Sequence, residues 1–279
     1  SWGDYELTAN GRLGAESNLA WAIELADLSR AGKLLGGEWQ GALSGRGQLL
    51  GALDSPQVVA QVVATDLLVQ GVGMRSAELE ANLSSNGDIK LNLFVAEVQM
   101  SGESVDELAL TVRGTRQDHQ LSLVVDSPRA EVALVVNGSL QDSKVWTFDL
   151  AELDLLHPDF DSRQPDHRWR LVAPARGEVA KGRFTLLPLC LAQLLPEEAG
   201  ELCIDAALAQ GKLAANLVLE RLGLANLNGL LDADTRVAGL VSGEAHWTGA
   251  VASTSGAFAL TDVELSTRQN AEWLRVAEF

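Results

Sequence analysis

The feature that most constrains the fold is an alternation of apolar and polar residues that recurs along most of the chain. Successive side chains of a β-strand point to opposite faces, so an apolar residue at every second position gives one apolar and one polar face. Each alternating run therefore predicts a half-buried strand, and together the runs predict an all-β chain. The apolar positions of these runs are Leu19, Trp21, Ile23, Leu25, Ile89, Leu91, Leu93, Val95, Leu108, Leu110, Val112, Leu121, Leu123, Val125, Val132, Leu134, Val136, Trp146, Phe148, Leu150, Leu213, Leu217 and Leu219.

Turn signals separate the runs. Asn10-Gly11, Asn86-Gly87, Asn137-Gly138 and Asn228-Gly229 are dipeptides typical of tight hairpin turns. Roughly sixteen to eighteen short strands follow from this spacing. Stacked side by side, they would form a ladder of roughly 80 Å, which is natural for a trough-like or solenoid-like sheet. A one-residue slip of the alternation at Ala96-Glu97 predicts a β-bulge.

Helix signals are few, and we expect at most one or two short helices. Ser29–Gly36 fits a single turn, and the leucine-rich stretches Leu189–Leu195 and Leu217–Leu231 fit short amphipathic helices. Gly223 and Gly229 weaken the last of these, since glycine costs about 1 kcal/mol inside a helix.

Composition narrows the function classes. The net charge of −17 argues against a nucleic-acid partner and against adhesion to an anionic bilayer, because both need clustered Lys and Arg. Hydrophobic residues make up 47% of the chain but aromatic residues only 5%. Two interpretations of the apolar faces stay open: a closed core between two packed sheets, or an open trough whose smooth aliphatic inner face holds hydrocarbon.

No catalytic constellation stands out, and we expect no enzyme, no cofactor and no metal. Gly177–Arg183 has the glycine spacing of a phosphate loop but lacks the Lys-Ser/Thr pair that contacts phosphate and metal. The acidic stretch Asp149–Trp169 lacks the glycine of a calcium loop and the thiols or paired histidines of a zinc site. We interpret it as a solvated loop broken by Pro158 and Pro165.

Cys190 and Cys203 are the only cysteines, and they flank a loop that contains a proline. Two buried free thiols would be usual in a cytosolic protein. In an oxidising compartment the same pair fits a disulfide between two strand ends, which would contribute about 3 kcal/mol through loop closure. We favour the disulfide if the chain is extracytoplasmic.

Several short motifs resemble one family. They are Trp146-Thr-Phe-Asp-Leu150, Trp169-Arg-Leu-Val-Ala-Pro174, Phe184-Thr-Leu-Leu-Pro-Leu-Cys190-Leu191 and Leu202-Cys203. This order resembles the TamB family, the inner-membrane-anchored component of the translocation and assembly module of Gram-negative bacteria and a relative of the AsmA-like proteins. The resemblance is clearest over residues 140–250, and residues 1–139 agree in their general β pattern.

The resemblance implies a long curved β-sheet trough, the β-taco, with an apolar interior that spans the periplasm. It implies a conduit for phospholipid acyl chains between the inner and outer membranes, in the service of outer-membrane biogenesis. The alternative is a chaperone-like scaffold that assists outer-membrane protein assembly with the barrel protein TamA by β-augmentation. The family's membrane anchor and its TamA-binding region are expected outside this segment, and a stretch after Val218 is expected as a short helix at the groove. We expect residues 1–279 to be one continuous piece of the trough.

Overall fold

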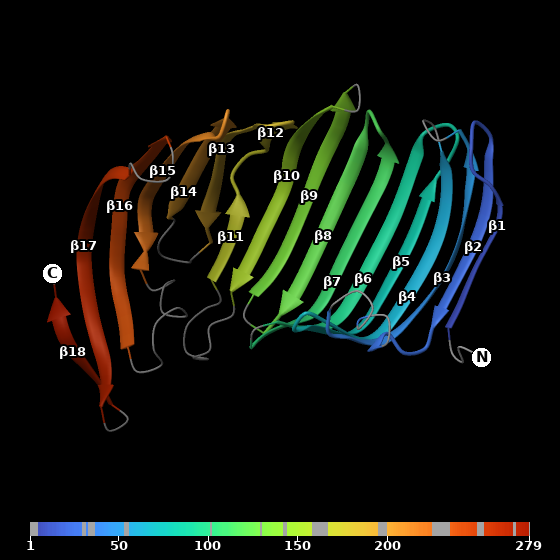
Figure 1. The fold of residues 1–279 in the computed structure, drawn as a ribbon. Coiled ribbons are helices and arrows are strands. Elements are labelled where there is room, and N and C mark those ends of the chain that lie inside the picture. Colours follow the sequence, from blue (N-terminus) through green and yellow to red (C-terminus); the bar gives the residue numbers. More distant parts are fainter. Residues whose placement is uncertain are drawn as a thin grey trace. The chain divides into compact units, whose positions relative to one another are not determined.

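The structure is a computed structural model that describes residues 5–29, 32, 37–52, 56–100, 102–128, 130–141, 144–157, 167–194, 200–224, 235–249, 254–269 and 272–278. The chain divides into two compact units, Ser1–Leu140 (unit 1) and Gln141–Phe279 (unit 2). Each unit is built from antiparallel strands, as Figure 1 shows.

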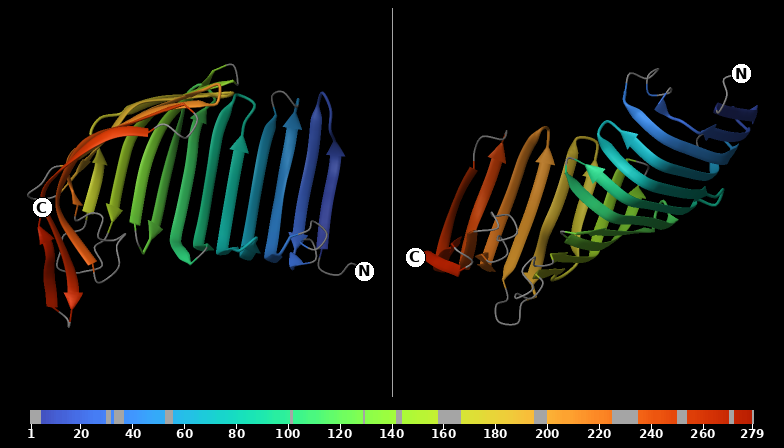
Figure 2. Two further views of the ribbon diagram at one scale, coloured as in Figure 1. Left: turned by 60° about the vertical axis from the view of Figure 1, so that its left-hand side comes forward. Right: turned by 90° about the horizontal axis from the view of Figure 1, so that it is seen from below.

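Unit 1 is an antiparallel meander in which each strand pairs with the next along the chain. Its strands bend along their length, as the right-hand view of Figure 2 shows for those coloured blue to green. The short connections hold turn residues such as Gln70-Gly71, which both have positive φ. The strands are β1 (Tyr5–Arg12), β2 (Ser17–Leu25), β3 (Trp39–Gly51), β4 (Gln57–Val69), β5 (Val72–Leu83), β6 (Asp88–Met100), β7 (Glu103–Thr115), β8 (His119–Ser127) and β9 (Ala130–Gln141).

Unit 2 follows the same plan with one interruption. Two short strands, β11 and β12, both lie between β10 and β13 and together fill one strand position. The break between them is closed by Val172, whose N–H donates to the Cys190 carbonyl at 2.9 Å. The strands are β10 (Val145–His157), β11 (His167–Leu171), β12 (Ala175–Ala180), β13 (Arg183–Gln193), β14 (Glu201–Ala209), β15 (Lys212–Gly223), β16 (Thr235–Gly249), β17 (Thr254–Gln269) and β18 (Glu272–Glu278).

The all-β class is therefore confirmed, with eighteen strands in the described part of the chain. Within each unit the described strands form one sheet, and each strand mainly contacts the strands that pair with it. These residues therefore do not build a closed core between two packed sheets, which was the other interpretation of the apolar faces. A buried apolar cluster in unit 2 comprises Leu222, Leu224, Val241 and Val263, with Trp169, Leu219 and Val237 packed against it.

Two expected helices are wrong over the residues described. Leu189–Gln193 belongs to β13, and Leu217–Gly223, including the stretch after Val218, belongs to β15. The remainder of both stretches lies largely outside the described residues. Near Ser29 a helical turn is present, because the Gly32 N–H donates to the Leu28 carbonyl at 2.9 Å.

The phase slip predicted in β6 is present, but it arises differently from the expected bulge. Glu97 has a left-handed backbone with φ 51° and lies opposite Arg75, and both drop out of the ladder. The registers on the two sides of this position agree, so no extra residue is inserted. The two side chains form an ion pair of 2.7 Å. The alternation therefore shifts at a left-handed residue and not at an inserted one.

One kind of register shift recurs in both units, and the same short motif builds it each time. In unit 1 the register shifts at Gly41, which begins Gly41-Ala-Leu-Ser-Gly45 and lies opposite Asp66-Leu67. In unit 2 it shifts at Gly239, which begins Gly239-Leu-Val-Ser-Gly243 and lies opposite Asp262-Val263. Both glycines have positive φ (103° and 115°), and both aspartates are left-handed (49° and 53°).

Replacing Gly41 by valine should destabilise unit 1 by about 2 kcal/mol or more. A Cβ there would lie 2.5 Å from the Asp66 carbonyl oxygen, and the backbone φ of 103° is strained for any other residue. The measurement is the urea midpoint of unfolding. Gly73→Ala is the matched control, since its Cβ would meet no atom closer than 3.8 Å. Equal midpoints for the two variants would contradict this account of the bulge.

Candidate functional site

The ladder of unit 1 places all of the predicted apolar positions of that unit on one face. Residues paired directly across neighbouring strands point to the same side of a sheet. One such row crosses all nine strands, and the rows on either side of it are apolar as well. The central row is Leu7, Ile23, Gly45, Val62, Leu79, Leu93, Leu110, Leu123 and Leu134.

Sequence reasoning missed the part of this face that β3–β5 contribute. Its apolar residues there include Leu43, Leu49, Val58, Leu79 and Leu83. The signal was present, because Ala77-Glu-Leu-Glu-Ala-Asn-Leu83 alternates as cleanly as any run in the chain. Alanines and glycines at many positions of β3–β5 lowered its apparent hydrophobicity.

The apolar face of unit 1 is more enclosed than the opposite face of the same strands. In β8, Val124 on the opposite face is 47% exposed, whereas Leu123 and Val125 are half-buried. In β4, Val63 is 40% exposed on that face, whereas Val62 is half-buried. Side chains of the apolar face therefore shield one another, although a second layer does not cover them in the described residues.

Unit 2 also gathers its predicted positions on one face. Trp146 and Phe148 pair with Val179 and Gly177, and these rows continue through β13 and β14 to Leu213 and Ala215 of β15. Further along β15, Leu217 and Leu219 pair with Ile204 and Leu202. Leu150 is buried, while Leu213 stays 41% exposed. We call the two surfaces, one in each unit, the apolar faces.

One polar side chain interrupts the apolar face of unit 2. Gln193 pairs with Trp169 and is 1% exposed. Among the described residues, its Nε2 and Oε1 have no hydrogen-bond partner. A buried amide left unsatisfied costs about 1–3 kcal/mol.

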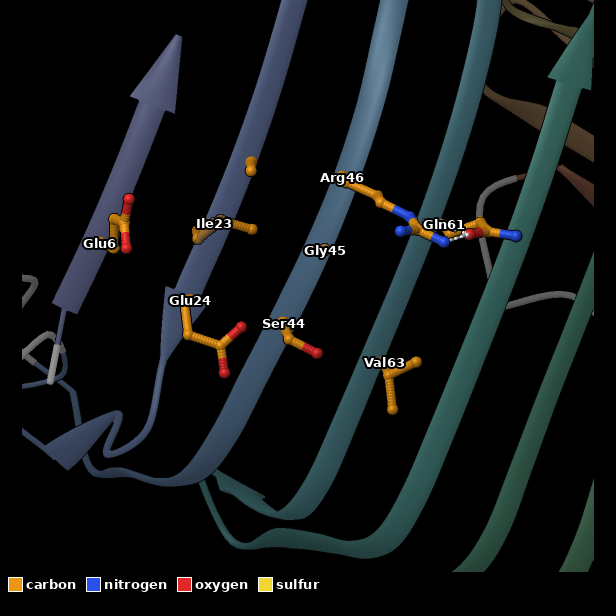
Figure 3. A pocket seen from close by; sticks show the side chains of 9 residues that line it. Glu6, Ile23, Glu24, Ser44, Gly45, Arg46, Gln61 and Val63 are labelled. Carbon is orange, nitrogen blue, oxygen red and sulfur yellow. Dashed lines mark hydrogen bonds between the residues drawn. The ribbon is translucent and has the colours of Figure 1, made fainter.

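The opposite face of unit 1 carries polar side chains that form hydrogen bonds across strands. Arg46 donates through Nε and Nη2 to Gln61 Oε1 at 3.2 and 3.0 Å, and Gln61 Nε2 donates to Glu80 Oε1 at 3.4 Å. Figure 3 shows the hollow of about 500 Å³ in which Arg46 and Gln61 lie, with Glu6 and Glu24 at its other side. This open, charged surface suits water rather than hydrocarbon.

The acidic stretch Asp149–Trp169, considered above as a metal-binding loop, lies partly in strands β10 and β11. Two of its aspartates form ion pairs with arginines. Asp154 accepts from Arg168 at 2.7 Å and from Arg170 at 3.1 Å, and Asp149 pairs with Arg176 at 3.0 Å. The hydrogen bond from Arg168, helped by Arg170 and opposed by partial burial, holds the pKa of Asp154 below its ordinary value. These two carboxylates are therefore engaged by cations of the protein itself. The loop with Pro158 and Pro165 lies outside the described residues.

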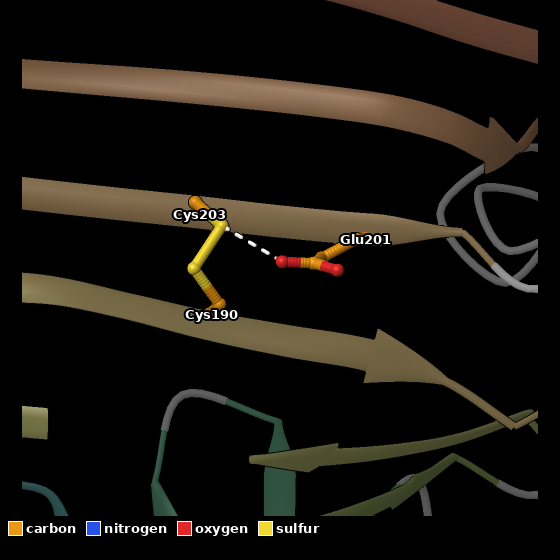
Figure 4. Close-up of a disulfide and its surroundings, with 3 residues drawn as sticks. All are labelled: Cys190, Glu201 and Cys203. Carbon is orange, nitrogen blue, oxygen red and sulfur yellow. Dashed lines mark hydrogen bonds between the residues drawn. A yellow bond between two sulfur atoms is a disulfide. The ribbon is translucent and has the colours of Figure 1, made fainter. Parts of the chain in front are cut away.

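Cys190 and Cys203 form a disulfide, as predicted. They are directly opposed on β13 and β14, with 4.1 Å between their Cα atoms (Figure 4). The row that they occupy continues to Val218 and Glu244, so the disulfide lies on the face opposite the leucines of β13 and β14. Glu201 Oε1 is 3.2 Å from Cys203 Sγ. Among the described residues this trio alone clusters as metal ligands would, but sulfurs joined to each other are not thiolates.

Over the described residues, fold and site together define a class of protein: an antiparallel β-sheet protein whose strands gather apolar residues on one face of the sheet. The family model for the N-terminal domain of TamB matches residues 1–277. The chain therefore belongs to the TamB family. Members of this family are transport or assembly components of the cell envelope and work with TamA.

No solved structure matches the chain. Within the described residues, we find no helix with the length and apolar character needed to cross a membrane.

Proposed function

We propose that this chain is a length of a periplasmic conduit along which phospholipid passes between the inner and outer membranes. Its acyl chains would lie against the apolar faces, and both units would serve as parts of one trough. The observation that carries the proposal is the apolar row that runs without a charged residue from Leu7 in β1 to Leu134 in β9.

Energetics favour hydrocarbon as the occupant of such a face. Burial of one methylene contributes about 0.8 kcal/mol, so an acyl chain on the face offsets much of the cost of leaving a bilayer. Some neighbouring positions of the apolar face differ by only one methylene, for example Leu110 and Val112 on β7. A ligand is then not trapped at one site, which permits it to slide.

The proposal is tested by mass spectrometry of lipids extracted from the purified chain. We expect phospholipid to co-purify, and a photoactivatable residue at Leu110 on the apolar face to crosslink to it. The same residue placed at Thr111, on the opposite face, is the control. A chain free of phospholipid, with equal crosslinking at both positions, would rule out the conduit.

Strand β1 favours a second candidate function. The side chains of Glu6–Arg12 are all exposed, and in unit 1 the described pairing of β1 is with β2. A strand of this kind is a template for β-augmentation by unfolded outer-membrane strands. Crosslinks from β1 to a nascent barrel protein, without bound lipid, would favour such a chaperone over the conduit.

A further inference from the structure

Three aromatic rings on the apolar faces lie across a glycine of the neighbouring strand. Each ring and its glycine are directly paired: Trp21 with Gly47, Phe148 with Gly177, and Phe258 with Gly243. A Cβ on the glycine would lie 2.6 Å from Trp21 Cζ2, 2.1 Å from Phe148 Cζ and 2.6 Å from Phe258 Cδ1. The rings therefore occupy the space that a side chain on the glycine would fill.

In this arrangement the aromatic ring projects less far above the apolar face. Side chains of a strand normally stand roughly perpendicular to the sheet, so a large ring would project above leucine and valine neighbours. A ring that lies over a glycine adds apolar area without that projection. An aromatic ring across from a glycine also supplies packing contacts that the glycine itself lacks. This effect would stabilise the sheet without any role in lipid passage. A test has to separate the two roles.

Phe148 and Gly177 offer the cleanest case. At Gly47 and Gly243 a Cβ would also meet a backbone carbonyl, of Val59 at 2.6 Å and of Ala257 at 2.4 Å. At Gly177 the three nearest atoms all belong to the ring of Phe148. That ring also stacks on Trp146, with 4.8 Å between centroids, so it cannot move sideways freely. A methyl group at position 177 would lift the ring away from the sheet.

We propose that the pair of Phe148 and Gly177 sets the clearance for acyl chains over the apolar face of unit 2. This rests on the proposed conduit function and makes Gly177 a residue that determines what can pass. A flattened ring leaves room for a linear acyl chain, whereas a raised ring forms a step in its path.

The experiment uses the purified chain with phosphatidylcholine vesicles and a photoactivatable residue at Leu208 in unit 2 or at Leu110 in unit 1. Leu208 of β14 lies on the same face of unit 2 as Phe148, and it pairs with Phe184 of β13. We expect Gly177→Ala to lower lipid crosslinking at Leu208 by roughly tenfold and to leave crosslinking at Leu110 unchanged. Adding Phe148→Leu to Gly177→Ala should restore it, because the smaller side chain no longer forms the step.

The outcomes distinguish a failure of the clearance role of Phe148 and Gly177 from a failure of the proposed conduit function. Unchanged crosslinking at Leu208 in Gly177→Ala overturns the clearance role and leaves the conduit standing. A loss that Phe148→Leu does not restore also overturns it, since the ring would not be the obstacle. Absence of lipid crosslinks at both positions in the unsubstituted chain removes the conduit itself.

Discussion

Glutamate in place of Leu123 is expected to reduce phospholipid bound to unit 1 by more than tenfold while the sheet stays folded. Leu123 lies in the central row of the apolar face, between Leu110 and Leu134. A carboxylate there would have to lose water wherever an acyl chain covers it, and no cation of the row would pair with it. Leu91→Arg should act in the same way from β6. The measurement is the ratio of extracted phospholipid to protein, with circular dichroism to confirm the fold.

Matched controls come from the neighbouring residues on the opposite face. Ser122→Glu and Asn92→Arg introduce the same charges in the same strands, among polar partners such as Thr111. They should bind lipid normally. If Leu123→Glu and Leu91→Arg also retain bound lipid and lipid transfer, the apolar face is not the path.

Reduction of the Cys190–Cys203 disulfide should lower the stability of unit 2 by about 3 kcal/mol, the loop-closure value for residues thirteen apart in sequence. The effect should appear as a lower midpoint of thermal or urea unfolding for unit 2, with unit 1 unaffected. Because the disulfide lies on the face opposite the apolar face of unit 2, lipid crosslinking at Leu208 should not change.

The double variant Cys190→Ser, Cys203→Ser provides the comparison, since it removes the bond without a reductant. It should unfold at the same midpoint as the reduced chain. If the midpoint of unit 2 is the same with and without the bond, the disulfide does not hold β13 and β14 together.

Much of the candidate site could be predicted from the sequence because alternation is a local property. Leu91 and Leu93 share a face whatever strand lies beside them. The sequence could not show which strands pair, so the continuity of the row from β1 to β9 emerged only from the register. The split position filled by β11 and β12 is likewise a matter of pairing between distant residues.

The wrong helices have a specific cause. A bulge turns a spacing of two into a spacing of three, and leucines three apart imitate a helix. In β15 the register shifts between Leu219 and Leu222, where Arg221 is left-handed with φ 49°. In β13 the shift between Leu186 and Leu189 comes just before the predicted stretch, where four leucines in seven residues suggested a helix. The same effect hid the recurrence of the Gly41 and Gly239 motifs, since both bulges depend on an aspartate more than twenty residues away.

The meander of unit 1 makes the length of the sheet an adjustable quantity. Since each strand rests mainly on its two ladder neighbours, stability is close to a sum of local terms, as in repeat proteins. Insertion of a whole hairpin adds two strands, or about 10 Å, and keeps both the strand direction and the alternation of faces. Insertion of a single strand would reverse the direction of every strand after it. Evolution can thus fit such a sheet to a wider or narrower gap in steps of one hairpin, without redesigning either surface.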